Sequence, residues 1–150
     1  MLSPFEKLLV GLVEARIRFI TVGGVACVMN EYVRVTDDVD ILVENSPVNI
    51  ATLLNFLSAY GEGFAKELKT EDFSDEEGAI RIIEYFPIDI FTRMGGHRYS
   101  DLVSKSFLFD VAGTKVPCLN IEGLILLKQE SYRAKDKIDV EHLKSMKKKS

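Results

Sequence analysis

The sequence predicts an α/β protein of the α+β type, with helices flanking a mixed β-sheet and a pair of helices at its C-terminal end. Short runs of β-branched and aromatic residues, bounded by glycine, proline or asparagine, indicate strands. Stretches with apolar residues every three or four positions indicate helices. The two kinds alternate at first, and strands then prevail until the last two helices. Because 150 residues is a usual length for one domain, we expect a single domain over 1–150.

The first part of the chain carries clear helix and strand signals. Ser3 suits an N-cap and Pro4 the first helical position, and apolar residues then recur at helical spacing up to Ala15. Gly23-Gly24 ends the first strand-like run. We expect helices over 4–15, 25–32 and 48–60, and strands over 18–22 and 39–43.

The rest of the chain is predicted to be rich in strands. An acidic, polar stretch over 70–78 indicates a surface loop. Pro87 separates two apolar runs, and because proline cannot donate to a ladder, we expect a bulge or break there. Gly113 indicates a hairpin turn, and Asn120 suits a helix N-cap. We expect strands over 79–85, 88–91, 107–111 and 115–119, a helical turn over 99–104, and helices over about 120–132 and 136–146.

Composition argues against several classes of protein. The formal net charge of −4 argues against broad, non-specific nucleic-acid binding, which favours an excess of Lys and Arg. The N-terminus lacks the basic region of a secretory signal, and no apolar run reaches the ~20 residues of a membrane span. Cys27 and Cys118 stand in apolar surroundings without CxxC spacing. We therefore expect a cytoplasmic protein with no membrane partner, in which both cysteines are small core residues.

Asp38 and Asp40 are the centre of chemical interest. Side chains alternate along a strand, so the two carboxylates point the same way and repel each other unless a cation lies between them. Hard divalent ions such as Mg²⁺ bind carboxylate oxygens and substrate phosphates together. Gly23-Gly24 ends a strand and opens a helix, where main-chain N–H groups can approach an anion. A metal holder and a phosphate acceptor would then be neighbours, as two-metal phosphoryl or nucleotidyl transfer requires.

Each of these signals also has an ordinary structural explanation. Gly-Gly after a strand is often only a turn, and Asp-x-Asp is common on solvated strand edges. Their combination is more specific, because a buried strand, Gly-Gly, a short helix and Thr-x-Asp-Val-Asp before an apolar strand follow one another within 18–43.

On these residues the sequence resembles the nucleotidyltransferase superfamily, which has the DNA-polymerase-β-like fold, and in particular its minimal and abortive-infection-type branch. The shared pattern is Gly-Gly-x-Ala, then Arg-x-[Ser/Thr]-x-Asp, an apolar residue and Asp. In this chain it matches Gly23, Gly24, Ala26, Arg34, Thr36, Asp38 and Asp40. The resemblance covers about residues 17–43 and 80–143. It implies the nucleotidyltransferase fold and a role for the glycines, Arg34 and Thr36 in binding substrate.

The resemblance also implies a third metal-binding carboxylate on a later strand. Asp89 is the natural match, because an aspartate inside an apolar strand is costly unless it is paired or bound to metal. The ordinary alternative is an aspartate that lies at a strand end beside the Pro87 break. Glu84 is a weaker substitute for the same role.

The C-terminal part strengthens the resemblance, since the family carries a Lys on a helix followed by Arg-x-Lys-Asp-x-x-Asp. Lys128 matches the lysine that the family assigns to the triphosphate. Arg133, Asp136 and Asp139 match the later positions, close to the active site. The alternative is structural, because charges three or four residues apart also stabilise helices.

The chain departs from the family in two ways. The Gly-Ser of catalytic members is Gly23-Gly24 here, so a serine hydroxyl that would meet phosphate is missing. Larger abortive-infection-type enzymes carry a helical C-terminal domain that helps to select substrate. Here that selection would fall to a partner protein, a homodimer, or the loops over 61–78 and 93–105.

The leading hypothesis is therefore an enzyme, a nucleotidyltransferase that uses two Mg²⁺ ions, with Mn²⁺ as the alternative, and a nucleoside triphosphate. Asp38, Asp40 and Asp89 would hold the metal, and Lys128 would neutralise the phosphates. The acceptor is left open between RNA, a protein and a small molecule. A second hypothesis is an inactive nucleotidyltransferase-like binding module, such as a toxin–antitoxin or regulatory component. A third is a structural domain whose acidic strand is accidental.

Overall fold

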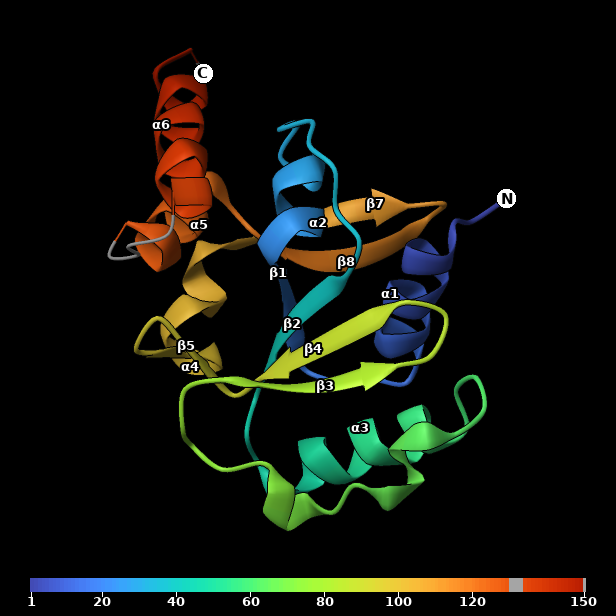
Figure 1. Cartoon of the computed structure of the whole chain (residues 1–150). Coiled ribbons are helices and arrows are strands. Elements are labelled where there is room, and N and C mark those ends of the chain that lie inside the picture. Colours follow the sequence, from blue (N-terminus) through green and yellow to red (C-terminus); the bar gives the residue numbers. More distant parts are fainter. Residues whose placement is uncertain (130–133, 150) are drawn as a thin grey trace.

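The computed structural model describes residues 1–129 and 134–149. Its strands are β1 (Phe19–Val22), β2 (Val39–Val43), β3 (Ala79–Ile83), β4 (Pro87–Phe91), β5 (Arg93–Met94), β6 (His97–Arg98), β7 (Ser106–Val111) and β8 (Thr114–Leu119). Six of them form one sheet in the order β3-β4-β2-β1-β8-β7 (Figure 1), while β5 and β6 form a small hairpin. The pairs β1/β8 and β2/β4 are parallel and the others antiparallel. The predicted mixed sheet is confirmed.

Helices lie on both sides of this sheet, with α3 on one side and α2, α5 and α6 on the other (Figure 1). Ser3 accepts a hydrogen bond from the Glu6 N–H, and Asn120 accepts one from the Gly123 N–H, so both predicted N-caps are confirmed. The helices are α1 (Pro4–Glu14), α2 (Gly23–Met29), α3 (Pro47–Ser58), α4 (Tyr99–Leu102), α5 (Ile121–Lys128) and α6 (Ala134–Lys149), and the short 3₁₀ turns are η1 (Phe64–Glu67), η2 (Thr70–Asp72) and η3 (Val103–Lys105).

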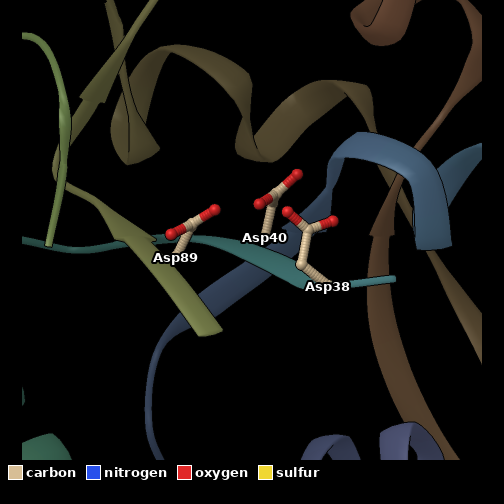
Figure 2. A group of neighbouring side chains, drawn as sticks. All are labelled: Asp38, Asp40 and Asp89. Carbon is tan, nitrogen blue, oxygen red and sulfur yellow. The ribbon is translucent and has the colours of Figure 1, made fainter. Parts of the chain in front are cut away.

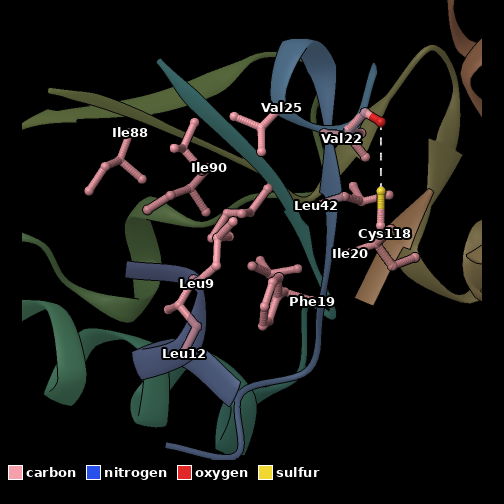
Figure 3. Close-up of a cluster of buried hydrophobic side chains, with 14 of the residues drawn as sticks. Leu9, Leu12, Phe19, Ile20, Val22, Val25, Leu42, Ile88, Ile90 and Cys118 are labelled. Carbon is pink, nitrogen blue, oxygen red and sulfur yellow. Dashed lines mark hydrogen bonds between the residues drawn. The ribbon is translucent and has the colours of Figure 1, made fainter. Parts of the chain in front are cut away.

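The core lies between the central strands and the helices that cover them. Leu9 and Leu12 of α1 point toward Phe19 of β1 and Ile90 of β4 (Figure 3), and all four side chains are buried. Such packing holds the central strands rigidly, so the side chains at the ends of these strands have well-defined positions. Cys27 and Cys118 are buried and free, as predicted.

The predicted break near Pro87 is confirmed, but it lies over 84–86, where the chain turns between β3 and β4. Pro87 itself begins β4 and pairs with Ile83, so the two strands form a hairpin. Proline is tolerated at the first residue of a strand, which explains this position. Several helix boundaries also differ; for example, α2 begins at Gly23 and ends at Met29, and α5 ends at Lys128. The predicted helix positions 130–132 lie outside the described residues.

None of the helices in the described part of the chain is both long enough and apolar enough to cross a membrane.

Candidate functional site

Three aspartates converge at the edge where β2 begins and β4 runs beside it (Figure 2). Asp40 of β2 and Asp89 of β4 are register partners in a parallel pair, so their side chains leave the same face of the sheet. Asp38 precedes β2 and points the same way as Asp40. One carboxylate oxygen from each of the three lies within 4.8 Å of the others.

The charges of this cluster conflict with one another. Burial, together with the charges of Asp38 and Asp89, raises the pKa of Asp40 to about 7. Hydrogen bonds from Arg81 lower the pKa of Asp89. Three converging carboxylates, one of them pushed toward its neutral form, are a donor set that fits a hard divalent cation. The cluster could therefore hold a metal ion.

Arg81 is a member of the site that sequence reasoning missed. Its side chain leaves β3 opposite Asp89, with its Nε and Nη2 atoms each 2.8 Å from an oxygen of that carboxylate. The Nη2 atom also lies 3.5 Å from an oxygen of Asp38. An arginine in the middle of an apolar strand was the available signal, but its partner depends on the register between β3 and β4.

Gly23 and Gly24 lie against the acidic segment. A Cβ atom on Gly23, whose φ is +68°, would lie 2.0 Å from Oδ2 of Asp40. A Cβ atom on Gly24 would lie 2.5 Å from Oγ1 of Thr36. That hydroxyl donates to the Asp38 carbonyl oxygen at 3.2 Å. The two glycines are therefore needed for close approach as well as for the turn.

A second charged cluster joins α5, α6 and the segment after α2. The Nζ atom of Lys128 lies 3.1 Å from Asp136 and 3.0 Å from Asp139. Asp139, which is 2% exposed, also accepts hydrogen bonds from Tyr32 at 2.7 Å and Arg34 at 2.5 Å. Burial acts to raise the pKa of Asp139, but hydrogen bonds from Tyr32 and Lys128 and the charges of Lys128 and Arg34 outweigh it and lower that pKa.

One cleft of about 370 Å³ joins the two clusters. Asp139 is not among the residues that line it but is hydrogen-bonded to Arg34 and Lys128, which are. Arg133 lies outside the described residues. Apolar side chains, among them Phe91, Met94 and Leu127, complete the lining. The predicted site residues that line it are Gly23, Gly24, Arg34, Thr36, Asp38, Asp40, Asp89, Lys128 and Asp136.

Glu84, the weaker candidate for the third metal ligand, lies elsewhere. Its carboxylate accepts hydrogen bonds from the backbone N–H groups of Glu62 and Phe64, both at 2.9 Å. The residue therefore holds the loop after α3 at the far end of β3, and it is not part of the aspartate cluster.

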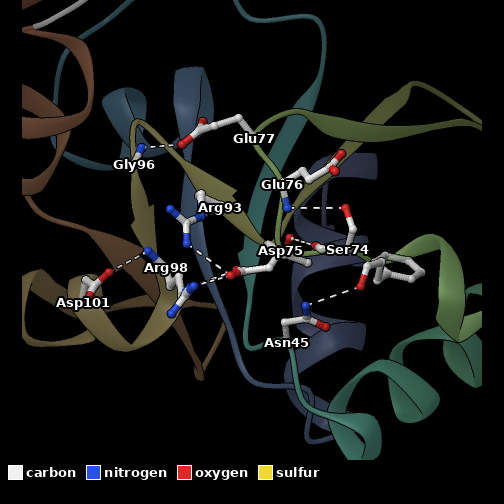
Figure 4. A network of polar contacts seen from close by, with 11 residues as sticks. Asn45, Ser74, Asp75, Glu76, Glu77, Arg93, Gly96, Arg98 and Asp101 are labelled. Atoms are coloured by element: carbon white, nitrogen blue, oxygen red, sulfur yellow. Dashed lines mark hydrogen bonds and ion pairs between the residues drawn. The ribbon is translucent and has the colours of Figure 1, made fainter.

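The two loops expected to influence substrate choice are tied together (Figure 4). Asp75 accepts hydrogen bonds from Arg93 and Arg98, the former at 3.1 Å. Glu77 accepts the backbone N–H groups of Gly95 and Gly96 at 3.1 and 2.5 Å. The acidic segment before β3 thus fixes the β5–β6 hairpin, which carries Met94 into the cleft.

Comparison with known proteins gives a likeness in fold. No protein-family model matches the chain, and no curated protein matches it in sequence. A solved structure from Thermotoga maritima, provisionally described as a nucleotidyltransferase, aligns over 95% of this chain and 87% of its own, with a TM-score of 0.57 and 19% identity. An antigenic nucleotidyltransferase-like protein from Paracoccidioides brasiliensis aligns over 95% of this chain and 72% of its own, with a TM-score of 0.59 and 16% identity. At these identities the likeness shows the fold.

Proposed function

We propose that this chain, whose fold is that of the nucleotidyltransferases, transfers a nucleoside monophosphate from a nucleoside triphosphate to an acceptor and releases pyrophosphate. One observation carries the proposal: Asp38, Asp40 and Asp89 bring their carboxylates together in the cleft that Lys128 also lines. A carboxylate cluster beside a lysine is the arrangement that a metal-bound triphosphate needs.

Asp38 and Asp40 would hold two Mg²⁺ ions, or Mn²⁺ in their place, and Asp89 would share the ion nearest the acceptor. Such ions, when bound, neutralise charge on the phosphates and favour ionisation of the acceptor hydroxyl. The fit rests on the donor set, since hard divalent ions take carboxylate oxygens.

The chain's own groups position the triphosphate. Gly23 and Gly24 open α2 and line the cleft. The first N–H groups of a helix have no acceptor within it, so those of the two glycines would be available to phosphate oxygens. The Lys128 ammonium has three protons, and it donates hydrogen bonds to Asp136 and Asp139. These bonds fix its position and leave one proton that can bind a phosphate. As in other phosphoryl transfers, positioning and electrostatics would supply most of the rate.

The reaction balances as an in-line displacement. The acceptor oxygen forms a bond to the α-phosphorus, and the bond from that phosphorus to the β-bridging oxygen breaks. Pyrophosphate leaves with the electron pair, while the acceptor proton passes to a carboxylate of the cluster or to water. The acceptor is a hydroxyl or phosphate of RNA, a protein or a small molecule.

The proposal is tested with α-labelled nucleoside triphosphates, Mg²⁺ and a fractionated cell extract. The wild-type chain is expected to transfer label to an acceptor, whereas Asp38→Asn and Asp40→Asn should each lose at least about a hundredfold of that transfer. Asp110→Asn is the matched control, because Asp110 is an exposed aspartate on β7 whose nearest charge is Lys115 at 3.7 Å. Unchanged transfer in either cluster variant would contradict the proposal.

A binding module without turnover is the second candidate, as a toxin–antitoxin component or regulatory partner. One contact favours it: Arg81 already compensates the charge of Asp89 and Asp38. Calorimetric titration with each triphosphate separates the candidates. The enzyme requires triphosphate binding that depends on both Mg²⁺ and Asp40, whereas absence of binding to any triphosphate would favour the module.

A further inference from the structure

Arg81 binds both oxygens of the third carboxylate in the cluster. Its Nε donates to Oδ1 of Asp89 and its Nη2 to Oδ2, both at 2.8 Å. This two-pronged contact is the strongest geometry that an arginine and a carboxylate can form. Because Nη2 is also 3.5 Å from Asp38, the guanidinium joins two of the three carboxylates.

Asp40 differs from its two neighbours. Among the ion pairs of the described residues, Arg81 pairs with Asp38 and Asp89, and Asp40 has none. A cation that enters the cluster therefore meets one uncompensated carboxylate first. To use Asp89 as well, it must share or take the oxygens that the guanidinium holds.

The two partners in this contact are unequally free to move. Arg81 leaves the edge strand β3, and its side chain is 53% exposed. The Asp89 side chain is 10% exposed and leaves β4, which is hydrogen-bonded to a strand on each side. The arginine can therefore swing into solvent on its long stem, while the carboxylate stays in place.

Electrostatics decides what happens when metal binds. A divalent ion on Asp89 would lie beside the guanidinium, and like charges at such short separation repel strongly where the surroundings are partly buried. From these contacts we infer that Arg81 is a latch on Asp89, which a second divalent ion must displace before the site is complete. The inference rests on the proposed function, because it concerns how the same metal site fills.

Metal binding alone tests the latch, without any acceptor. Mn²⁺ is titrated by calorimetry and by the loss of its free EPR signal, into the wild-type chain, Arg81→Gln and Arg81→Lys. The wild type is expected to bind one ion more tightly than a second. Arg81→Gln should tighten the weaker step by roughly tenfold, because it removes the competing charge. The Mn²⁺ affinity of Arg81→Lys in this step should lie between those of the wild type and Arg81→Gln. Lysine keeps the positive charge but cannot form the two parallel hydrogen bonds to Asp89.

Arg18→Gln is the matched control. Arg18 is also an exposed arginine paired with a carboxylate, Glu44, at 3.1 Å, and it lies at the opposite end of β1 and β2. The change lowers the net charge equally and should leave both Mn²⁺ steps unaltered. Thermal unfolding in EDTA checks that every variant folds.

Each alternative outcome has its own meaning. Unchanged or weaker Mn²⁺ binding in Arg81→Gln would overturn the latch, because Arg81 would then be neutral or would help to hold Asp89 for the metal. That outcome leaves the proposed function standing, provided that the wild type still binds Mn²⁺ through Asp40. Absence of Mn²⁺ binding in every variant would remove the metal site and the latch together.

Discussion

Asp40 and Asp89 lie opposite each other on the adjacent parallel strands β2 and β4, with their carboxylates on one face of the sheet. Neither side chain can avoid the other, because both strands are packed on the far face by the hydrophobic core. The electrostatic cost of this arrangement is largest for Asp40. Its pKa is raised to about 7, first by burial and then by the charges of Asp38 and Asp89.

Asp40→Asn should stabilise the metal-free protein, and more so at higher pH. The pKa of Asp40 is 3.8 in a model compound and about 7 in the fold, so between these values the folded chain keeps a proton that the unfolded chain has released. The contribution of Asp40 to the free energy of unfolding of the wild-type protein is therefore lost as pH rises through 7. Urea unfolding in EDTA should show a gain on the order of 2 kcal/mol at pH 8 that shrinks toward pH 4. A gain that is equal at pH 5 and pH 8 would contradict this.

Metal affinity should follow the same proton. Because an ion must displace the proton on Asp40, Mn²⁺ binding should weaken as pH falls below about 7, by up to about tenfold per pH unit. Calorimetry at pH 6 in two buffers of different ionisation enthalpy measures the proton released, expected to be near one per site. Asp110→Asn should behave as the wild type, since Asp110 is far from the cluster in the sheet order. Binding without proton release at pH 6 would exclude Asp40 as a ligand.

Gly23→Ala should damage the site for two separable reasons. The residue has a φ of +68°, and its new Cβ atom would lie 2.0 Å from Oδ2 of Asp40. Gly113→Ala is the control, because Gly113 has a φ of +92° with nothing within 4 Å of the added atom. Backbone strain alone costs about 1–3 kcal/mol. Denaturant unfolding should show a larger loss at Gly23 than at Gly113, and Mn²⁺ binding should fall in the first variant only.

Gly24→Ser restores the Gly-Ser of the family pattern and should still be unfavourable here. The added Cβ atom would lie 2.5 Å from Oγ1 and 2.9 Å from Cβ of Thr36. Thr36→Gly removes both atoms, so the double variant should lose less stability than the sum of the single ones, by about 1 kcal/mol or more. Additive losses in urea unfolding would show that the two positions do not compete for space.

Sequence patterns predicted the parts of the site that depend on local geometry. The two-residue period of a strand places Asp38 and Asp40 together, and Gly23-Gly24 marks the turn beside them. The Arg81 contact depends on the register of β3 against β4, which is set by the Glu84–Phe86 hairpin turn and the packing of both strands. That register is a non-local property, so no spacing in the sequence reveals it.

The second cluster shows the same limit. The spacing of Asp136 and Asp139 allows each to pair with a basic residue three or four positions away along the chain. In the structure both aspartates form ion pairs with Lys128 on α5, and Asp139 also pairs with Arg34 from the segment after α2. Packing between α5, α6 and α2 brings these side chains together. The resemblance identified the residues, but only the packed helices identify the partners.

Asp139→Asn should be the most destabilising single change in this cluster. The buried carboxylate accepts hydrogen bonds from Tyr32, Arg34 and Lys128, so its neutral replacement leaves two largely buried cations without full compensation. Breaking such a pair costs about 3–5 kcal/mol. Tyr32→Phe, which removes one neutral donor, should cost about 1 kcal/mol and serves as the lower reference.

The pH dependence of Asp139→Asn provides an independent check. The pKa of Asp139 is lowered in the fold from its usual 3.8, so its contribution to stability is present above that value and is lost as pH falls through the lower folded pKa. The gap between wild type and Asp139→Asn in urea unfolding should therefore be constant from pH 5 to pH 8 and close in more acidic solution. This pH trend is opposite in sign to the one expected for Asp40→Asn. Urea unfolding of both variants over the same pH series therefore distinguishes Asp139, which has ion-pair partners, from Asp40, which has none among the described residues. A gap for Asp139 that widened toward low pH would show that its ion pairs with Lys128 and Arg34 do not stabilise the fold.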